Sequence, residues 1–225
     1  GGALAYDGIV EKKTFEMKEP LKTLGGKEIK GVKVGWESYG KLNDQKSNVI
    51  LITHFFSGNS HAAGKYKPED AAPGYWDAVI GAGKPIDTDK YFVVASATLV
   101  NLHKGAITTG PASIDPATGK PYGLSFPVVT IRDFVTVQKA LLDSLGVTKL
   151  HAVVGASMGM NAGRLASRAP TTAGISMLRA TMAVCEVRPP TSVTKPVKTL
   201  PLNWSMSAGA MSLATRTSGS SPPKS

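Results

Sequence analysis

Hydrophobic and polar residues follow two different periods along the first two-thirds of the chain. Residues 27–40 (KEIKGVKVGWESYG) alternate between polar and apolar, which predicts an exposed antiparallel strand or pair of strands. Continuous apolar runs at 48–53, 90–96 and 150–156 are typical of strands buried on both faces. Residues 132–146 place apolar side chains at helical spacing before a glycine stop. Short connections between these elements predict an α/β fold, with a mostly parallel sheet flanked by helices.

Two segments depart from this pattern. Residues 98–130 form a long insert rich in Gly, Pro, Asp and Ser, which predicts loops and turns. Residues 158–225 contain no His and no Asp, and they close with the low-complexity stretch TRTSGSSPPKS. We therefore expect an α/β core over residues 1–159 and a divergent, basic, partly disordered segment over 160–225.

The net charge of +10 is unevenly distributed. Residues 1–157 hold 18 Lys and Arg against 15 Asp and Glu, whereas 158–225 hold 8 against the single Glu186. The basic excess is scattered among Ser, Thr and Pro, and only Trp204 accompanies it as an aromatic residue. Since a nucleic-acid surface needs clustered cations with stacking aromatics, no nucleic-acid partner is expected.

The cysteine and hydrophobic content indicate where the protein works. The single cysteine, Cys185, excludes an internal disulfide framework and favours a reducing, cytoplasmic setting. No apolar run reaches the length of about 18 residues that a membrane span needs. The opening GGALAYDG lacks the charged start and apolar core of an intact signal peptide. Ala3-Leu4-Ala5 resembles the end of a cleavage site, so export after cleavage is a minor alternative.

The candidate chemistry lies directly after the third buried strand. Gly155-Ala156-Ser157-Met158-Gly159 has the Gly-x-Ser-x-Gly spacing of a nucleophile elbow. Such a turn exposes the serine at the carboxyl edge of the sheet, and the backbone N–H of Met158 can stabilise an oxyanion. The alternative is a glycine-rich turn without chemistry. No His, Cys and Asp cluster has metal-ligand spacing, so no metal is expected.

Long motifs connect this turn to a known family. THFFSGNSHAAGKY, GYWDAVIGAGKPIDTDKYFVV, TTGPASIDPATGKPYGLSFPVVTIRD and LGVTKLHAVVGASMG together resemble the homoserine O-acetyltransferase family over about residues 9–159. The resemblance implies an α/β-hydrolase fold and transfer of an acetyl group from acetyl-CoA to the hydroxyl of L-homoserine, a step in methionine biosynthesis. It assigns Ser157 as the acylated nucleophile and Phe56 as the second oxyanion donor beside Met158. It implies no tightly bound cofactor; the partners are then the small-molecule substrates and, at most, a second copy of the chain.

The sequence departs from the family after Gly159. In this fold the triad follows the chain order Ser, acid, His, yet Glu186 is the only acid after Ser157 and no histidine follows. Upstream, His54 and His61 fall in the oxyanion-loop region, where a structural or loop-orienting role is expected, and the same applies to His103 in the insert. His151 lies six residues before Ser157, about 20 Å along an extended strand. None is well placed as a general base.

Several interpretations of this departure stay open. A reading-frame slip near codon 160 explains the change in composition, and a truncated paralogue with a new tail is the competing hypothesis. The function is then an impaired acyltransferase, an esterase of the same fold or an inactive remnant. The acetyl or succinyl donor and the acceptor are also open. We expect the apolar edge of the strand at 150–156 to be covered by residues 175–204 or to cause self-association. Lys120 and Arg132 are candidate CoA-phosphate contacts, with a solvated surface as the simpler interpretation.

Overall fold

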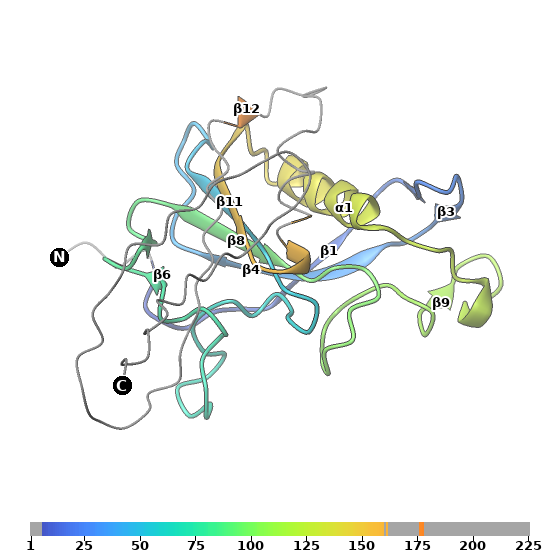
Figure 1. Cartoon of the computed structure of the whole chain (residues 1–225), viewed down its shortest axis with the longest axis horizontal. Coiled ribbons are helices and arrows are strands. Elements are labelled where there is room, and N and C mark those ends of the chain that lie inside the picture. Colours follow the sequence, from blue (N-terminus) through green and yellow to red (C-terminus); the bar gives the residue numbers. More distant parts are fainter. Residues whose placement is uncertain (1–5, 160, 162–175, 178–225) are drawn as a thin grey trace, which may run out of the picture. The chain divides into compact units, whose positions relative to one another are not determined.

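The computed structural model describes residues 6–159, 161 and 176–177. Its centre is a six-stranded sheet with the order β1-β4-β8-β5-β11-β12 (Figure 1). Strands β8, β5, β11 and β12 are parallel, and β4 and β1 continue the sheet in antiparallel pairing. The bounds of the six strands are β1 Lys13–Glu16, β4 Lys33–Tyr39, β5 Val49–Thr53, β8 Phe92–Ser96, β11 Lys149–Gly155 and β12 Ser176–Met177.

One longer helix and several short elements lie outside this sheet. The helix α1 runs from Ile131 to Ser144, one or two residues from each end predicted from the sequence. The insert at 98–130 is mostly loop, as predicted, but it also contains a two-stranded hairpin and a short 3₁₀ helix. The remaining elements are β2 Leu21–Lys22, β3 Glu28–Ile29, β6 Ile80–Gly81, β7 Ile86–Asp87, β9 Ile114–Asp115, β10 Lys120–Pro121 and η1 Gly123–Ser125.

Both faces of the parallel strands are buried, as their apolar runs predict. On β5, Val49 and Leu51 face a cluster that includes Leu141 and Leu142 of α1. The alternate residues of β5 face a second cluster, which is built from β4, β8, the segment before β1 and the segments that follow β5. That cluster comprises Val10, Tyr39, Ile50, Ile52, Ala62, Ala63, Trp76, Ile80, Val93 and Ala95. In the described residues, therefore, a helix covers one face of the sheet and loops cover the other.

The prediction of an exposed strand within 27–40 is wrong for β4. This strand lies inside the sheet between β1 and β8, and Val34, Glu37 and Tyr39 are at most 1% exposed. The alternation reflects two buried faces of different chemistry. Val34 contacts an apolar cluster next to α1, whereas Glu37 and Tyr39 face a polar network under the loop after β5.

The outer edge of β11 is partly covered. Ser176 and Met177 of β12 pair with Lys149 and Leu150, so the segment predicted to cover this edge does reach its start. The rest of that segment lies outside the described residues, and so do Glu186 and Trp204. The expected C-terminal division at 160–225 is described only at residues 161 and 176–177 and stays a prediction. Among the helices that the structure describes, none has the length and apolar character needed to cross a membrane.

Candidate functional site

The elbow predicted at Gly155–Gly159 forms a tight bend at the carboxyl end of β11. Ser157 has a φ of +53°, in the left-handed region that residues other than glycine seldom adopt. Its side chain is exposed, and a helical turn begins at Met158. A serine in this conformation between a strand and a helix has the backbone geometry that presents a nucleophile.

The two flanking glycines are required by close approach of the neighbouring strand. A Cβ on Gly155 would overlap the hydroxyl of Thr53, and a Cβ on Gly159 would overlap its carbonyl oxygen. The Thr53 hydroxyl instead donates a hydrogen bond to the carbonyl of Gly159 at 2.8 Å. Because Thr53 also pairs with Gly155 in the parallel ladder, β5 holds both ends of the elbow.

The same contacts bring the loop after β5 to the elbow. Thr53 ends β5, and the predicted oxyanion residue Phe56 follows three positions later with a 67% exposed side chain. Among the described residues, the backbone N–H groups of Phe56 and Met158 have no acceptor. Within that part of the chain both groups can therefore donate to a ligand, and their assignment as an oxyanion hole stays a prediction.

His54 is buried in this loop and held at both ring nitrogens. Its Nδ1 lies 2.6 Å from the carbonyl oxygen of Phe55, and its Nε2 lies 3.2 Å from the N–H of Thr98 and 3.3 Å from Nδ2 of Asn101. Burial lowers the pKa of His54, with a smaller contribution from His103, and the hydrogen bond to Phe55 opposes this. His54 is thus a neutral imidazole whose acceptor nitrogen is occupied.

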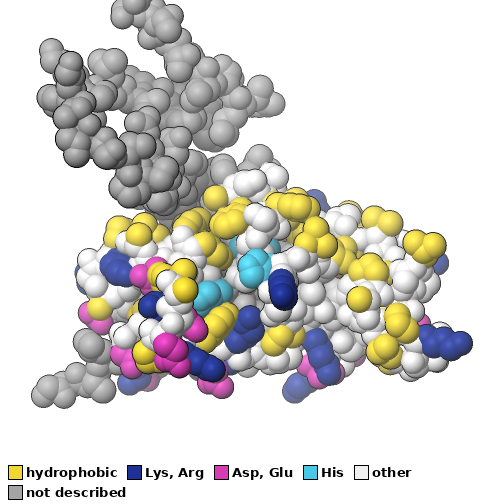
Figure 2. All heavy atoms as spheres, turned by 90° about the horizontal axis from the view of Figure 1, so that it is seen from below, with side chains coloured by type: hydrophobic (Ala, Val, Ile, Leu, Met, Phe, Trp, Pro, Cys, Tyr) yellow, Lys and Arg dark blue, Asp and Glu magenta, His cyan; other side chains and the backbone are white. Residues whose placement is uncertain are grey.

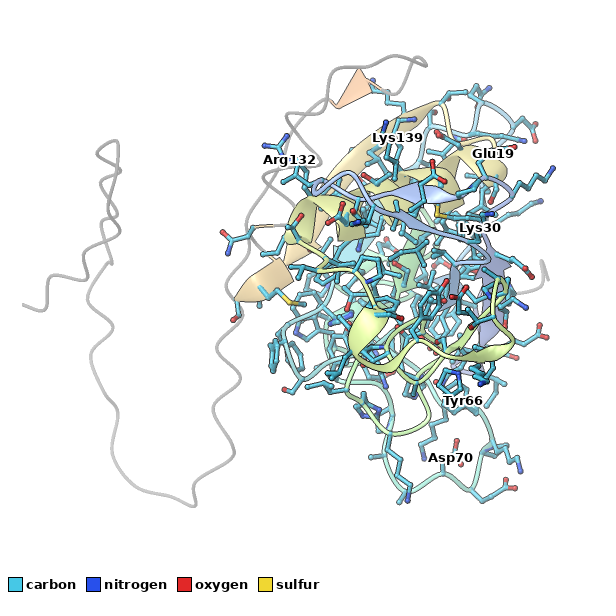
Figure 3. The ribbon with its side chains drawn as sticks, turned by 90° about the vertical axis from the view of Figure 1, so that its right-hand side faces the viewer. Glu19, Lys30, Tyr66, Asp70, Arg132 and Lys139 are labelled. Atoms are coloured by element: carbon cyan, nitrogen blue, oxygen red, sulfur yellow. The ribbon has the colours of Figure 1, made fainter. Side chains whose placement is uncertain are left out.

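A second histidine, His61, belongs to a carboxylate network that sequence reasoning missed. The fully buried Glu37 carboxylate accepts hydrogen bonds from the hydroxyls of Tyr39 and Tyr66 at 3.0 and 2.7 Å. It also accepts bonds from Ser60 at 3.2 Å and from Nδ1 of His61 at 2.9 Å. The ring of His61 stacks on Tyr66, which Figure 3 labels. An acid within an alternating strand was the available signal, but its partners lie up to 29 residues away.

The position of Glu37 in the sheet separates His61 from the elbow. Glu37 pairs with Ala95, Ala95 with Ile52 and Ile52 with Val154 of the elbow strand. Three strand spacings place Glu37 about 14 Å from β11. Because His61 bonds to Glu37, it is poorly placed as the base for Ser157.

The other two histidines do not contact Ser157 either. Nδ1 of His103 lies 2.9 Å from the carbonyl oxygen of Lys104 and 3.0 Å from Nδ2 of Asn59. His151 packs on Tyr91 near the opposite end of β11. In Figure 2, histidine side chains lie near the middle of one face, next to hydrophobic side chains and to Lys or Arg side chains. The structure therefore brings Ser157, Met158 and the Phe56 loop together without a histidine bonded to the serine.

The remaining candidates are peripheral. Lys120 is exposed at the start of β10, and Arg132 is exposed in the first turn of α1, where Figure 3 shows it at the surface. Their role toward CoA stays a prediction. Within the described part of the chain, no group of three or more His, Cys, Asp or Glu residues is arranged to hold a metal ion.

Comparison with known proteins covers about two-thirds of the chain. No protein-family model matches. The homoserine O-acetyltransferase of Methanosalsum zhilinae is 53% identical over 152 residues, which are 68% of this chain and 30% of that protein. A homoserine O-succinyltransferase of Magnetococcus marinus is 53% identical over 145 residues, 64% of this chain and 36% of that protein. Over about two-thirds of its length, the chain is homologous to the homoserine O-acetyltransferases.

Two solved structures bear on the fold. The homoserine O-acetyltransferase of Bacillus anthracis matches with a TM-score of 0.67 and 44% identity over 70% of this chain and 42% of that one. Esterase E22 matches with a TM-score of 0.66 and 66% identity over 68% of this chain and 42% of that one. These neighbours confirm the predicted α/β-hydrolase fold. The chain spans less than half the length of each of these relatives.

Proposed function

We propose that Ser157 accepts an acyl group from a thioester and passes it to the hydroxyl of homoserine. The observation that carries the proposal is the left-handed Ser157 between β11 and a helical turn. Homology to homoserine O-acetyltransferases and to a homoserine O-succinyltransferase supports the acceptor.

The chemistry proceeds in two balanced steps. The Ser157 oxygen bonds to the thioester carbonyl carbon, the C–S bond breaks, and the thiolate of CoA leaves while the serine proton passes to solvent or a base. The hydroxyl oxygen of homoserine then bonds to the acyl carbon and loses its proton, the bond between the acyl carbon and the Ser157 oxygen breaks, and the serine oxygen takes up a proton. Negative charge develops on the carbonyl oxygen in each tetrahedral stage, where the N–H groups of Phe56 and Met158 would stabilise it.

The size of the acyl group is part of this proposal. We assign acetyl-CoA as the donor because the homoserine O-acetyltransferase relatives match this chain. The succinyltransferase relative at 53% identity makes succinyl-CoA the donor to compare with it. Neither donor requires a tightly bound cofactor. We retain small-molecule substrates, a cytoplasmic setting and, at most, a second copy of the chain as its partners.

Ester hydrolysis is the second candidate, because esterase E22 is 66% identical over 68% of the chain. Water would then replace homoserine in the second step. Both reactions need the same nucleophile and the same two N–H donors, so the elbow alone does not distinguish them.

We further propose that the 225-residue chain by itself is slow. Residues 158–225 contain neither His nor Asp, and the four upstream histidines have other partners or lie far from the elbow. Removing a triad histidine leaves about 10³–10⁴-fold acceleration over water, supplied by the oxyanion hole and binding. Slow acylation that depends on Ser157 is therefore expected, and efficient turnover is not.

The test is release of CoA from acetyl-CoA and succinyl-CoA with and without L-homoserine, using Ser157→Ala as the control. Release that homoserine accelerates, with formation of acyl-homoserine, supports the transferase. Release to free acid that homoserine does not change supports the esterase. Equal release by the parent and Ser157→Ala would overturn both.

A further inference from the structure

We propose that His54 is a positioning residue for the oxyanion hole: it clamps the peptide between Phe55 and Phe56 so that the Phe56 N–H points at the acyl oxygen. The inference rests on the proposed role of Ser157 and the Phe56 N–H. It assigns His54 a specific task within that chemistry.

The clamp follows from the geometry of one peptide group. The carbonyl of Phe55 and the N–H of Phe56 belong to the same planar trans unit, so they point in opposite directions. The Phe55 oxygen accepts hydrogen bonds from Nδ1 of His54 at 2.6 Å and from the N–H of Gly58 at 2.8 Å. Two donors on the carbonyl fix the plane and therefore the direction of the Phe56 N–H. They also polarise the unit, which strengthens that N–H as a donor.

The opposite side of the imidazole determines its tautomer. The N–H of Thr98 and Nδ2 of Asn101 are both directed at Nε2, so Nε2 is the acceptor and Nδ1 carries the proton. The orientation of the Asn101 amide agrees, because its Oδ1 accepts the N–H of His103 at 2.8 Å. Burial, which leaves His54 only 2% exposed, favours the neutral ring that this pattern requires.

Asn101 extends the clamp to the insert at 98–130. Its Nδ2 also donates to the carbonyl of Gly58 at 3.1 Å, on the far side of the same turn. The insert and the loop after β5 are thus joined through His54 and Asn101. A side chain that only filled space at position 54 would leave the Phe55 carbonyl with the Gly58 bond alone.

Two substitutions test the hydrogen bonds of the two ring nitrogens of His54 separately. In His54→Asn, the amide nitrogen occupies the place of Nδ1 and can still donate to the Phe55 carbonyl, but the Nε2 acceptor is lost. In His54→Gln, the amide oxygen occupies the place of Nε2 and keeps the Thr98 contact, but the donor to Phe55 is lost. His151→Gln, remote from the elbow, is the matched control.

The first measurement is independent of activity. Nδ1 of His61 and of His103 also lies near an oxygen acceptor, so the His54 signal is assigned in nitrogen-15 NMR of histidine-labelled protein as the one absent from the spectra of both His54 variants. That signal is expected to be the Nδ1–H tautomer. The Phe56 amide resonance is expected to move in His54→Gln and to stay near its parent position in His54→Asn. An Nε2–H tautomer for His54, or equal movement in both variants, would overturn the clamp.

The second measurement is the rate at which p-nitrophenyl acetate acetylates Ser157, with thermal unfolding recorded in parallel. Loss of one oxyanion donor costs about 10²–10³-fold, so a misaligned donor in His54→Gln is expected to slow acylation at least about tenfold, against less than about threefold in His54→Asn. His151→Gln should react like the parent. Rates that simply follow the loss of stability in both variants would overturn the positioning role. A parent that never acetylates would overturn the proposed function, while the NMR result still decides the clamp.

Discussion

Ser157 is one of three non-glycine residues with positive φ in the described part of the chain, together with Lys46 and Val100. A side chain in this conformation costs about 1–2 kcal/mol relative to the right-handed region. The surrounding contacts maintain it, because the Thr53 hydroxyl of β5 bonds to the carbonyl of Gly159. Thr53 also leaves no room for a side chain at either flanking glycine. One of the three strained positions is thus the residue that the proposed chemistry uses.

Ser157→Gly should therefore separate stability from chemistry. Glycine adopts positive φ without the side-chain penalty, so the variant is expected to be more stable by about 1 kcal/mol, while Ser157→Ala stays near the parent. Both variants should lose acylation completely. Urea unfolding measures the first effect and acetyl labelling the second. A less stable Ser157→Gly would show that the serine side chain stabilises the elbow.

Glu37 differs from Ser157, because it is buried, stabilises the fold and takes no part in the proposed reaction. Its two oxygens accept four side-chain hydrogen bonds, two at each oxygen. In Glu37→Gln one oxygen becomes an NH₂ donor and faces groups that also donate. The loss is expected to be about 3 kcal/mol, because a buried network is left unpaired.

The matched control for this prediction is Glu16→Gln. Glu16 forms an exposed ion pair with Lys33 at 3.2 Å, and such pairs contribute about 0–1 kcal/mol. Chemical denaturation followed by the fluorescence of Trp36 and Trp76 compares the two variants. Equal losses in both would contradict the network.

The sequence indicates Ser157 but not Glu37, and the reason is physical. An elbow is a local motif: a strand, small flanking residues and a serine lie within ten positions. The Glu37 network forms only when the loop at 59–66 packs against β4, so its donors cannot be assigned from spacing. The histidines show the same limit, because the loop-orienting role expected for His54 depends on Thr98 and Asn101 across the fold.

At the level of elements, Asp133 connects helix α1 to the β2–β3 hairpin. One carboxylate oxygen accepts the N–H and hydroxyl of Thr130 at the start of the helix, at 2.6 and 2.8 Å. The other accepts the N–H of Leu24 at 2.8 Å, and Asp133 is only 2% exposed. One side chain thus caps a helix and fixes a turn more than a hundred residues earlier in the chain.

Asp133→Ala is expected to destabilise the fold by about 2–3 kcal/mol, since it removes the cap and leaves a buried N–H without an acceptor. Asp143→Ala is the control on the same helix, where loss of the exposed pair with Lys139 should cost at most about 0.5 kcal/mol. Thermal unfolding of both variants gives the comparison. Similar losses would indicate that Asp133 contributes only as a surface charge.

The elements themselves were largely predictable. The apolar runs predicted the positions of β5, β8 and β11, and the helical spacing of apolar residues predicted α1. Both are predictable because burial of one or two faces of an element produces a regular pattern of apolar residues in the sequence. The prediction that β4 is exposed was wrong. Polar and apolar residues also alternate along a strand when both faces are buried and one of them is polar. The small hairpins β2–β3 and β9–β10 leave no such period in two-residue strands.

At the level of the whole molecule, tyrosines with raised pKa values contribute to the behaviour at alkaline pH. Burial is the main cause that raises the pKa of Tyr6 to about 12, and it also raises the pKa values of Tyr39, Tyr66 and Tyr75. The unfolded chain releases these protons near pH 10, before the folded chain does. The free energy of unfolding should therefore be constant just below pH 10 and fall as the pH rises above it.

Tyr6→Phe tests the contribution of one tyrosine to this loss of stability at alkaline pH. The buried Tyr6 hydroxyl has no hydrogen-bond partner among the described residues, so its removal breaks no hydrogen bond there. The decline of unfolding free energy between pH 10 and 12 is expected to be shallower in the variant. Urea titrations at several pH values measure it. Parallel curves would show that Tyr6 ionises equally in the folded and unfolded states.

The elbow itself is tested most directly by mass spectrometry after incubation with acetyl-CoA or p-nitrophenyl acetate. One acetyl group on the peptide that contains Ser157, absent from Ser157→Ala, is the predicted result. Equal labelling in Ser157→Ala, or acetyl groups found only on other residues, would contradict the assignment of Ser157 as the acyl acceptor.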